Sequence, residues 1–383
     1  MVDFKLTEDQ IEMQGLFRKF AQEKIAPVAE EMDEKEEMNM DIIQEMKELG
    51  FFGIPFSDEI GGAGMDVLTY TLMMEEISKV DASCSITLSV HTSLCASSIE
   101  EFATPEQKEK WLRPLADGSK IGCFGLTEPN AGSDVAGAVT TADKDGDFYV
   151  INGSKIFTTN SGFADTFLVF ALTDKSVPAA KGMSAFLVDR NTPGLQVQPD
   201  IKRMGIRAAS NAEVYYQDVR VPAADMLGKE GQGFKIAMKA LDGGRIGIAA
   251  QCVGLAQGAL DEAIKYCKER KQFGKPITAF QNTQFRMAED QANINAARLL
   301  TWQAAVAKDN HENYGFYAAQ AKMFASAMAN DVCRHAVQYM GGYGYCREYG
   351  VERLLRDVKI TEIYEGTSEV QRMVIAGWLG ATK

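Results

Sequence analysis

The sequence Phe-Tyr-Val-Ile-Asn-Gly-Ser-Lys-Ile-Phe-Thr-Thr, residues 148–159, lies where the pattern that decides the fold changes. Apolar residues recur at helical spacing earlier in the chain, whereas here two short strand-like runs meet at Asn152-Gly153. Asn-Gly between two such runs is a strong signal for a two-residue hairpin turn. We therefore predict a β-hairpin that turns at these two residues.

Further short strands follow without intervening helices, separated by Gly, Pro, Asp and Asn. They are expected at 166–172, 183–188, 195–198 and 213–219. Regular spacing of this kind is typical of an antiparallel β-barrel or sandwich. The lack of alternating strands and helices, and of a usable Gly-x-Gly-x-x-Gly sequence, argues against a Rossmann domain.

Helices are expected on both sides of the strands. Three residue pairs have the spacing of a helix capping box: Thr7 with Gln10, Thr104 with Gln107, and Ser368 with Gln371. After the strands, long helices are expected at 232–268, 280–308, 314–340 and 346–358, and a last one after Glu365. The predicted fold class is α+β, with an N-terminal all-α domain (1–119), a central antiparallel β-barrel or sandwich domain (120–228) and a C-terminal four-helix bundle (229–383).

Composition and charge narrow the choice of partners. With 53 acidic and 40 basic residues, the net charge of −13 argues against nucleic acid as a partner. No apolar stretch has the length of a membrane span or follows the positive charges of a secretion signal, so we expect a cytoplasmic protein with no membrane partner. Seven cysteines are scattered without a Cys-x-x-Cys pair and only three histidines occur, so no metal site is predicted.

A carboxylate near the C-terminus is the first candidate for chemistry. Residues 360–371 read Ile-Thr-Glu-Ile-Tyr-Glu-Gly-Thr-Ser-Glu-Val-Gln, which places Glu365 in a loop before a helix, between Tyr364 and Gly366. Apolar surroundings disfavour a charged carboxylate and raise its pKa toward that of a useful general base. The alternative interpretation is an ordinary surface glutamate.

Four other segments have features that suit a ligand. The loop 124–134 combines glycines with hydroxyl groups, and residues 268–275 form a basic cluster in an acidic protein. Residues 241–245 place a Gly-Gly pair inside a helix, which indicates close packing, and residues 338–345 end a helix with glycines between aromatic residues. An ordinary turn and a solvated charged face are the alternatives for the first two segments.

In this order, the motifs resemble those of the acyl-CoA dehydrogenase family over nearly the whole chain. The resemblance is greatest to the short-chain (butyryl-CoA) dehydrogenases of anaerobic bacteria. It implies the family's fold of helical, β and four-helix-bundle domains, which agrees with the α–β–α order above. It also implies FAD as the cofactor, an acyl-CoA or enoyl-CoA substrate, and electron-transferring flavoprotein as a partner.

The resemblance also implies a role for individual residues. Glu365 matches the catalytic base. The positions implied to bind FAD are Phe124, Leu126, Thr127, Gly132, Ser133, Phe157 (Trp in many relatives), Thr159, Arg270, Phe273, Phe280, Gln281, Gln338, Gly341, Gly342, Thr367 and Glu369. Those implied to bind substrate are Ser133, Asp242, Arg245, Tyr364 and Gly366. Several of the FAD positions, from Arg270 to Gly342, would serve a neighbouring subunit, which implies a homo-oligomer, normally a tetramer built as a dimer of dimers.

The reaction implied is the FAD-dependent α,β-dehydrogenation of a short-chain acyl-CoA to the trans-2-enoyl-CoA. Glu365 takes the α-proton while a hydride leaves the β-carbon for flavin N5. Hydrogen bonds from a flavin ribityl hydroxyl and from the backbone N–H of the base polarise the thioester oxygen. Some branches of the family carry the base on the helix with the Asp-x-x-Arg motif; the matching position here is Gly244, which leaves Glu365 as the base.

Three alternatives stay open. The same catalyst can act physiologically as a 2-enoyl-CoA reductase on butyryl, acryloyl, aryl-acrylyl or cyclic acyl groups, because Glu365 can donate the proton that it accepts. A non-catalytic flavoprotein scaffold of the same fold should lack the base, and an oxidase would use O₂ directly. The acyl group is not determined: the pocket floor is expected near Leu88–Leu94 and Ile246–Leu255, where His91 either binds a polar acyl group or packs in the core.

Overall fold

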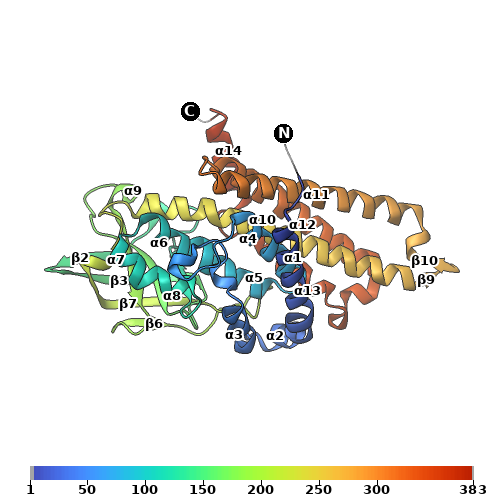
Figure 1. Ribbon diagram of the computed structural model, residues 1–383, viewed down its shortest axis with the longest axis horizontal. Coiled ribbons are helices and arrows are strands. Elements are labelled where there is room, and N and C mark those ends of the chain that lie inside the picture. Colours follow the sequence, from blue (N-terminus) through green and yellow to red (C-terminus); the bar gives the residue numbers. More distant parts are fainter. Residues whose placement is uncertain (1–3, 382–383) are drawn as a thin grey trace.

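The computed structural model describes residues 4–381, which form three regions along one long axis (Figure 1). Helices make up the first region, a single sheet the second and long helices the third, so the predicted fold class is confirmed. The sheet lies at one end of the molecule (Figure 1). A two-stranded hairpin of β9 (Lys271–Gln272) and β10 (Lys275–Pro276) lies at the other end, and helix α10 (Gly233–Glu269) runs between the two.

The N-terminal region is entirely helical. Its α-helices are α1 (Glu8–Phe20), α2 (Ala29–Lys35), α3 (Met40–Glu48), α4 (Val67–Ser78), α5 (Ala82–Ser89), α6 (Ser97–Phe102), α7 (Pro105–Gln107) and α8 (Arg113–Ala116). Wider π-helical turns join some of them: η1 (Ala21–Ile25), η5 (Val90–Ala96) and η6 (Lys108–Leu112). The capping boxes predicted at Thr7 and Thr104 are both present, each with its two reciprocal hydrogen bonds.

The middle region is one mixed sheet. Its strands are β1 (Gly122–Gly125), β2 (Thr141–Asp145), β3 (Phe148–Thr159), β4 (Thr166–Leu172), β5 (Met183–Asp189), β6 (Leu195–Val197), β7 (Asn211–Pro222) and β8 (Met226–Leu227), with a short helix α9 (Ala179–Gly182) before β5. The order is β6-β7-β3-β2-β4-β5-β8, with β1 paired to β4. The prediction of a purely antiparallel sheet was wrong, because β4 pairs in parallel with both β1 and β2. The strands of residues 4–381 form no closed barrel.

The hairpin predicted at Asn152-Gly153 was also wrong. Both residues lie inside β3, and the chain turns earlier, at Gly146-Asp147, where Gly146 has a φ of 61°. The Asn152 side chain exchanges two hydrogen bonds with Asp218 at a bulge between β3 and β7. A Cβ on Gly153 would lie 2.5 Å from the Thr140 hydroxyl oxygen, so glycine is required there by close packing rather than by a turn.

The C-terminal region is a bundle of long helices. After α10 come α11 (Gln281–Asp309), α12 (Gly315–Met340), α13 (Val351–Val358) and α14 (Ser368–Trp378). Buried alanines on α11 and α12 allow the long helices to pack closely. The capping box predicted at Ser368 was wrong: Thr367 is the N-cap, and its hydroxyl accepts a hydrogen bond from the backbone N–H of Val370. Gln371 instead turns back to the loop that precedes the helix.

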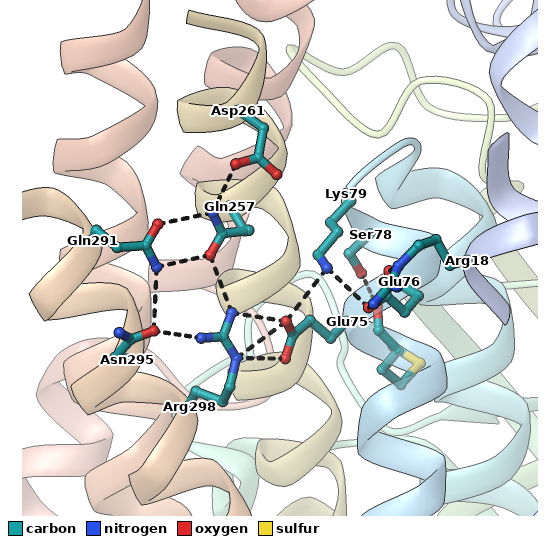
Figure 2. Close-up of polar contacts among 11 residues, drawn as sticks. Arg18, Glu75, Glu76, Ser78, Lys79, Gln257, Asp261, Gln291, Asn295 and Arg298 are labelled. Atoms are coloured by element: carbon teal, nitrogen blue, oxygen red, sulfur yellow. Dashed lines mark hydrogen bonds and ion pairs between the residues drawn. The ribbon is translucent and has the colours of Figure 1, made fainter. Parts of the chain in front are cut away.

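A buried polar network fixes the N-terminal helices to the bundle (Figure 2). Arg298 of α11 forms a bidentate pair with Glu75 of α4, with N–O distances of 2.8 and 3.0 Å, and also donates to Gln257 of α10. The neighbouring Glu76 accepts from Arg18 of α1 at 3.0 Å. Because both glutamates are almost fully buried, these pairs hold α4 in one position against α10 and α11.

Candidate active site

Glu365 lies in a tight turn between η12 (Lys359–Glu362) and α14. Glu365 and Gly366 both have left-handed backbone angles, with φ of 51° and 89°. This conformation suits glycine but strains a glutamate. The Gln371 side-chain amide donates to the carbonyl oxygens of Glu365 at 3.2 Å and of Gly366 at 2.8 Å, so α14 holds the turn.

The carboxylate of Glu365 is buried, and neither of its oxygens has a hydrogen-bond partner among residues 4–381. Burial raises the pKa of Glu365 to about 8, and the positive charges of Lys322 and Arg245 oppose that rise. A buried carboxylate without partners is costly to maintain and is typical of a general base.

Gly244 of α10 lies directly against this carboxylate. A Cβ on Gly244 would lie 1.9 Å from Oε2 of Glu365 and 2.8 Å from Cδ2 of Leu94. No other residue type fits without displacing the carboxylate. Gly244, the position that the resemblance matches to the base of other branches, therefore lies against Glu365, and the role of Glu365 as the base stays a prediction.

Polar side chains that carried no sequence motif lie near the same face of α10. A Cβ on Gly247, about one turn further along, would lie 2.7 Å from the Ser89 hydroxyl and 2.8 Å from the Tyr70 hydroxyl. The Tyr70 hydroxyl is buried and has no hydrogen-bond partner among residues 4–381. Tyr364, a predicted substrate residue, donates its hydroxyl proton to the side-chain oxygen of Gln251.

Asp242 and Arg245, the other predicted substrate residues on α10, pair with each other at 2.5 Å. Burial lowers the pKa of Arg245 and raises that of Asp242. Nε of Arg245 is buried and has no partner among the residues that the structure describes, so this guanidinium has a donor available for a ligand. Its charge also acts on Glu365, which places the pair beside the proposed base.

The loop after β1 is anchored by a buried ion pair. Phe124 and Leu126 are buried, whereas Gly132 and Ser133 are exposed at the tip of the loop. Glu128 accepts a hydrogen bond from Nζ of Lys155 at 2.7 Å, and its oxygens also accept from the backbone at 139 and 140. The buried pair of Glu128 and Lys155 therefore anchors the loop whose exposed tip carries the predicted flavin-binding residues Gly132 and Ser133.

Replacing Lys155 by Met is expected to lower the free energy of unfolding by about 3–5 kcal/mol, because the Glu128 charge is left buried and unpaired. Denaturant unfolding measures the loss. Lys144→Met, at an exposed position of the adjacent strand, is the matched control and should change stability by no more than about 0.5 kcal/mol. Equal stability of the two variants would contradict the anchoring role.

The second predicted flavin segment is the end of β3. Phe157 is 57% exposed and has a φ of 57°, so its ring stands out from the sheet at a register shift. The hydroxyl of Thr158 is buried and finds no partner within residues 4–381, whereas Thr159 accepts a hydrogen bond from the Asn211 side chain at 3.0 Å. An exposed ring beside an unsatisfied hydroxyl suits a flat polar ligand.

Most of the other predicted cofactor residues lie far from the Glu365 turn, at the hairpin end of the bundle. Arg270 stacks on Tyr343, at 5.4 Å from the ring centroid, and Phe273, 93% exposed, contacts Phe280. With Gln281, Gln338, Gly341 and Gly342 they belong to the hairpin end of the bundle (Figure 1). Gln338 is 16 residues beyond Lys322 on α12, or about 24 Å along the helix axis. One chain therefore does not bring this group to its own Glu365.

The last two predicted cofactor residues flank the Glu365 turn. Thr367 caps α14, as described above, and Glu369 is exposed and pairs with Arg372 at 3.2 Å.

His91, which the sequence left open, is a core residue. One ring nitrogen bonds to the Leu115 carbonyl oxygen and the other to the Gly122 backbone N–H, both at 3.1 Å. Burial lowers the pKa of His91 to about 3, so the ring is neutral. It joins η5 to β1 and has no free nitrogen for an acyl group.

Across residues 4–381, no cluster of His, Cys, Asp and Glu side chains has the arrangement of a metal site. None of the helices in that range is long and apolar enough to cross a membrane.

Three family models match the chain. They are the acyl-CoA dehydrogenase N-terminal domain over residues 7–119, the middle domain over residues 123–219 and the C-terminal domain over residues 231–380. The chain is 52% identical to a short-chain specific acyl-CoA dehydrogenase of Clostridium acetobutylicum, over 98% of this chain and 99% of the relative.

Solved structures agree with these matches. The butyryl-CoA dehydrogenase of Megasphaera elsdenii has a TM-score of 0.97 and 49% identity, with 99% of this chain and 100% of that chain covered. The same score and identity, with 99% of both chains covered, are found for a chain in a structure of the electron transferring flavoprotein of Acidaminococcus fermentans, a study of flavin-based electron bifurcation.

Proposed function

The chain belongs to the acyl-CoA dehydrogenase family, and from this we propose that it oxidises a short-chain acyl-CoA to the trans-2-enoyl-CoA and exchanges electrons with electron-transferring flavoprotein. Identity of about half the residues with short-chain dehydrogenases over the whole chain supports the reaction and the short acyl group. The observation that carries the mechanism is the buried, unpartnered carboxylate of Glu365 against Gly244.

Glu365 acts as the general base. In its ionised form, the carboxylate removes the α-proton of the thioester, and the missing side chain of Gly244 leaves room for the carboxylate itself. Burial keeps the carboxylate poorly solvated, which strengthens it as a base. Arg245 and Asp242 are proposed to hold the more distant part of the substrate, as the resemblance implies.

Members of this family are flavoproteins, and we propose that the flavin here is FAD. Several observations fit: the buried Thr158 hydroxyl lacks a partner, the Phe157 ring stands exposed beside it, and a Cβ on Gly132 would meet nothing within 4 Å. When bound, the flavin would supply the acceptor for the β-hydride. Leu126, Thr127, Ser133 and Thr159 are the further residues near the β1 loop and β3 proposed to hold it.

The distant group at the hairpin end supports a shared cofactor site. The group is exposed, basic and aromatic, and Gly341 and Gly342 both have open space where a Cβ would lie. We propose that it binds the dinucleotide of a neighbouring subunit, in a homotetramer built as a dimer of dimers. Light scattering after size-exclusion chromatography gives the subunit number.

The reaction is tested by anaerobic titration of the purified protein with saturated acyl-CoAs of increasing length. Butyryl-CoA is expected to bleach the oxidised flavin spectrum. The rate constant should rise about tenfold per pH unit below pH 8 and level off above it, since only ionised Glu365 accepts a proton and its pKa is about 8. No bleaching by any acyl-CoA, with reduction of enoyl-CoAs by a dye-linked donor, would contradict the oxidative direction.

A physiological 2-enoyl-CoA reductase is the second candidate, and one observation favours it. With a pKa of about 8, Glu365 is mostly protonated at neutral pH in the free protein, as a proton donor must be. The pH dependence of the reductive rate then has the opposite sign: it is highest below pH 8 and falls above it.

A further inference from the structure

Lys322 is a buried lysine next to the proposed base. It lies on α12 and is fully buried, and its Nζ donates to the carbonyl oxygen of Gly366 at 2.7 Å. Nothing in the composition or residue spacing of this alanine-rich helix distinguishes Lys322 from the other residues of α12. Burying an ammonium group is costly unless charges or hydrogen bonds compensate. The buried ammonium group of Lys322 therefore requires compensating contacts.

The contact holds a strained turn. Glu365 and Gly366 are consecutive left-handed residues, and this conformation strains a non-glycine residue such as Glu365. Two buried side chains, Lys322 from α12 and Gln371 from α14, donate to the same Gly366 carbonyl oxygen, at 2.7 and 2.8 Å. A carbonyl fixed from two helices has little freedom to rotate, so the preceding side chain is aimed in one direction.

The charge of Lys322 also acts on the base. Of the two positive charges that oppose the burial of the Glu365 carboxylate, Lys322 has the larger effect and Arg245 of α10 the smaller. Tyr70 of α4 and Tyr364 of the turn itself are the neutral titratable groups coupled to Glu365.

Around Lys322 the other groups are Cys252 of α10 and Glu362 of η12. Burial lowers the pKa of Lys322 to about 8, whereas the charge of ionised Glu365 raises it. An ionised Glu365 therefore helps to keep Lys322 charged, and the ammonium group in turn favours the ionised base.

We propose that Lys322 is a positioning residue for the base: its ammonium group fixes the Glu365–Gly366 turn and compensates part of the cost of the buried carboxylate. A neutral donor such as Gln371 supplies the first effect alone. The role in turnover rests on the proposed function, but the effect on Glu365 does not.

The test is an infrared titration of the Glu365 carboxyl group in the purified protein, with its band assigned by subtraction of the Glu365→Gln spectrum. In Lys322→Met the carboxyl group is expected to titrate about one pH unit higher than in the wild type, because an opposite charge is lost. The matched control is Gln371→Leu, which removes a neutral donor from the carbonyl oxygens of Glu365 and Gly366 and should move the titration much less than Lys322→Met does, because no charge is lost. The acid limb of the butyryl-CoA rate profile should move with the titration in each variant.

The outcomes separate the two proposals. An unchanged titration in Lys322→Met, or an equal shift in Gln371→Leu, overturns the role of the Lys322 charge, whatever the activity. A wild-type protein inert with all acyl-CoAs refutes the proposed function and leaves the titration to decide about Lys322. If Lys322→Met does not fold, Lys322→Gln, which keeps a polar amide without the charge, is read in the same way.

Discussion

Glu365→Gln is expected to lower kcat with butyryl-CoA by about 10⁴-fold and to leave the bound flavin in place. The carboxylate is the proposed proton acceptor, and the amide has nearly the same size but cannot take the α-proton. In the described part of the chain neither oxygen of Glu365 has a hydrogen-bond partner, so the amide breaks no hydrogen bond seen there. Anaerobic stopped-flow bleaching measures the rate, and the flavin absorbance per subunit measures cofactor content.

Glu362→Gln is the matched control for this variant. Glu362 lies three residues earlier on the same segment; its carboxylate pairs with Lys359 at 2.6 Å and affects the site only through its charge on Lys322. Its kcat should stay within about twofold of the wild type, as for a surface ion pair. A Glu365→Gln enzyme that retains more than a tenth of the wild-type kcat would refute Glu365 as the base.

Gly244→Ala is expected to lower kcat by about 100-fold, the second largest effect. The added methyl group would lie 1.9 Å from Oε2 and 2.7 Å from Cδ of Glu365, so the carboxylate must move out of line with the α-carbon. Leu94 closes the other side, with Cδ2 at 2.8 Å. Steady-state kinetics with butyryl-CoA measure the loss.

Gly243→Ala tests whether the loss belongs to the site or to the helix. A Cβ on Gly243 has its nearest neighbour at 3.4 Å, an ordinary contact, and alanine is the better helix former. This variant should keep near wild-type kcat and equal or higher stability. If the two variants lose activity equally, the effect is one of helix packing and the proposed contact with Glu365 is wrong.

Predictions from local sequence patterns were correct where residues a few positions apart form hydrogen bonds with each other. The capping boxes at Thr7 and Thr104 formed as predicted, because both partners of each box lie within four residues. The box at Ser368 failed because Gln371 has a competing use: its amide bonds to the carbonyls of the Glu365 turn, and Thr367 caps the helix instead.

Long-range pairing was not predictable in the same way. Asn152-Gly153 has the composition of a turn, yet Gly153 is required by the approach of Thr140, and Asn152 by the bulge at Asp218. These partners are distant in the sequence or come from another strand, so no local rule identifies them. The parallel pairing of β1 with β4 likewise joins strands that the β2–β3 hairpin separates in the sequence.

The candidate site also contains residues that local sequence indicates and residues that only long-range contacts reveal. Glu365 was proposed from its own segment, and the Gly-Gly pair of α10 correctly indicated that something packs closely there. Lys322 and Tyr70 were not predicted, because each lies in a helix without a recognisable sequence motif. Only their neighbours in the folded chain place them near Glu365.

The contact between Gly244 and Glu365 also constrains how such an enzyme can evolve. The two positions compete for one volume, so a side chain at position 244 is harmful while Glu365 is present, and loss of Glu365 is harmful while position 244 is glycine. If Glu365 is the base, as proposed, a carboxylate on the helix can replace it only when both positions change, and each single change is expected to lower activity. A change from one arrangement to the other would therefore pass through a less active intermediate, and we expect a lineage that has one arrangement to keep it.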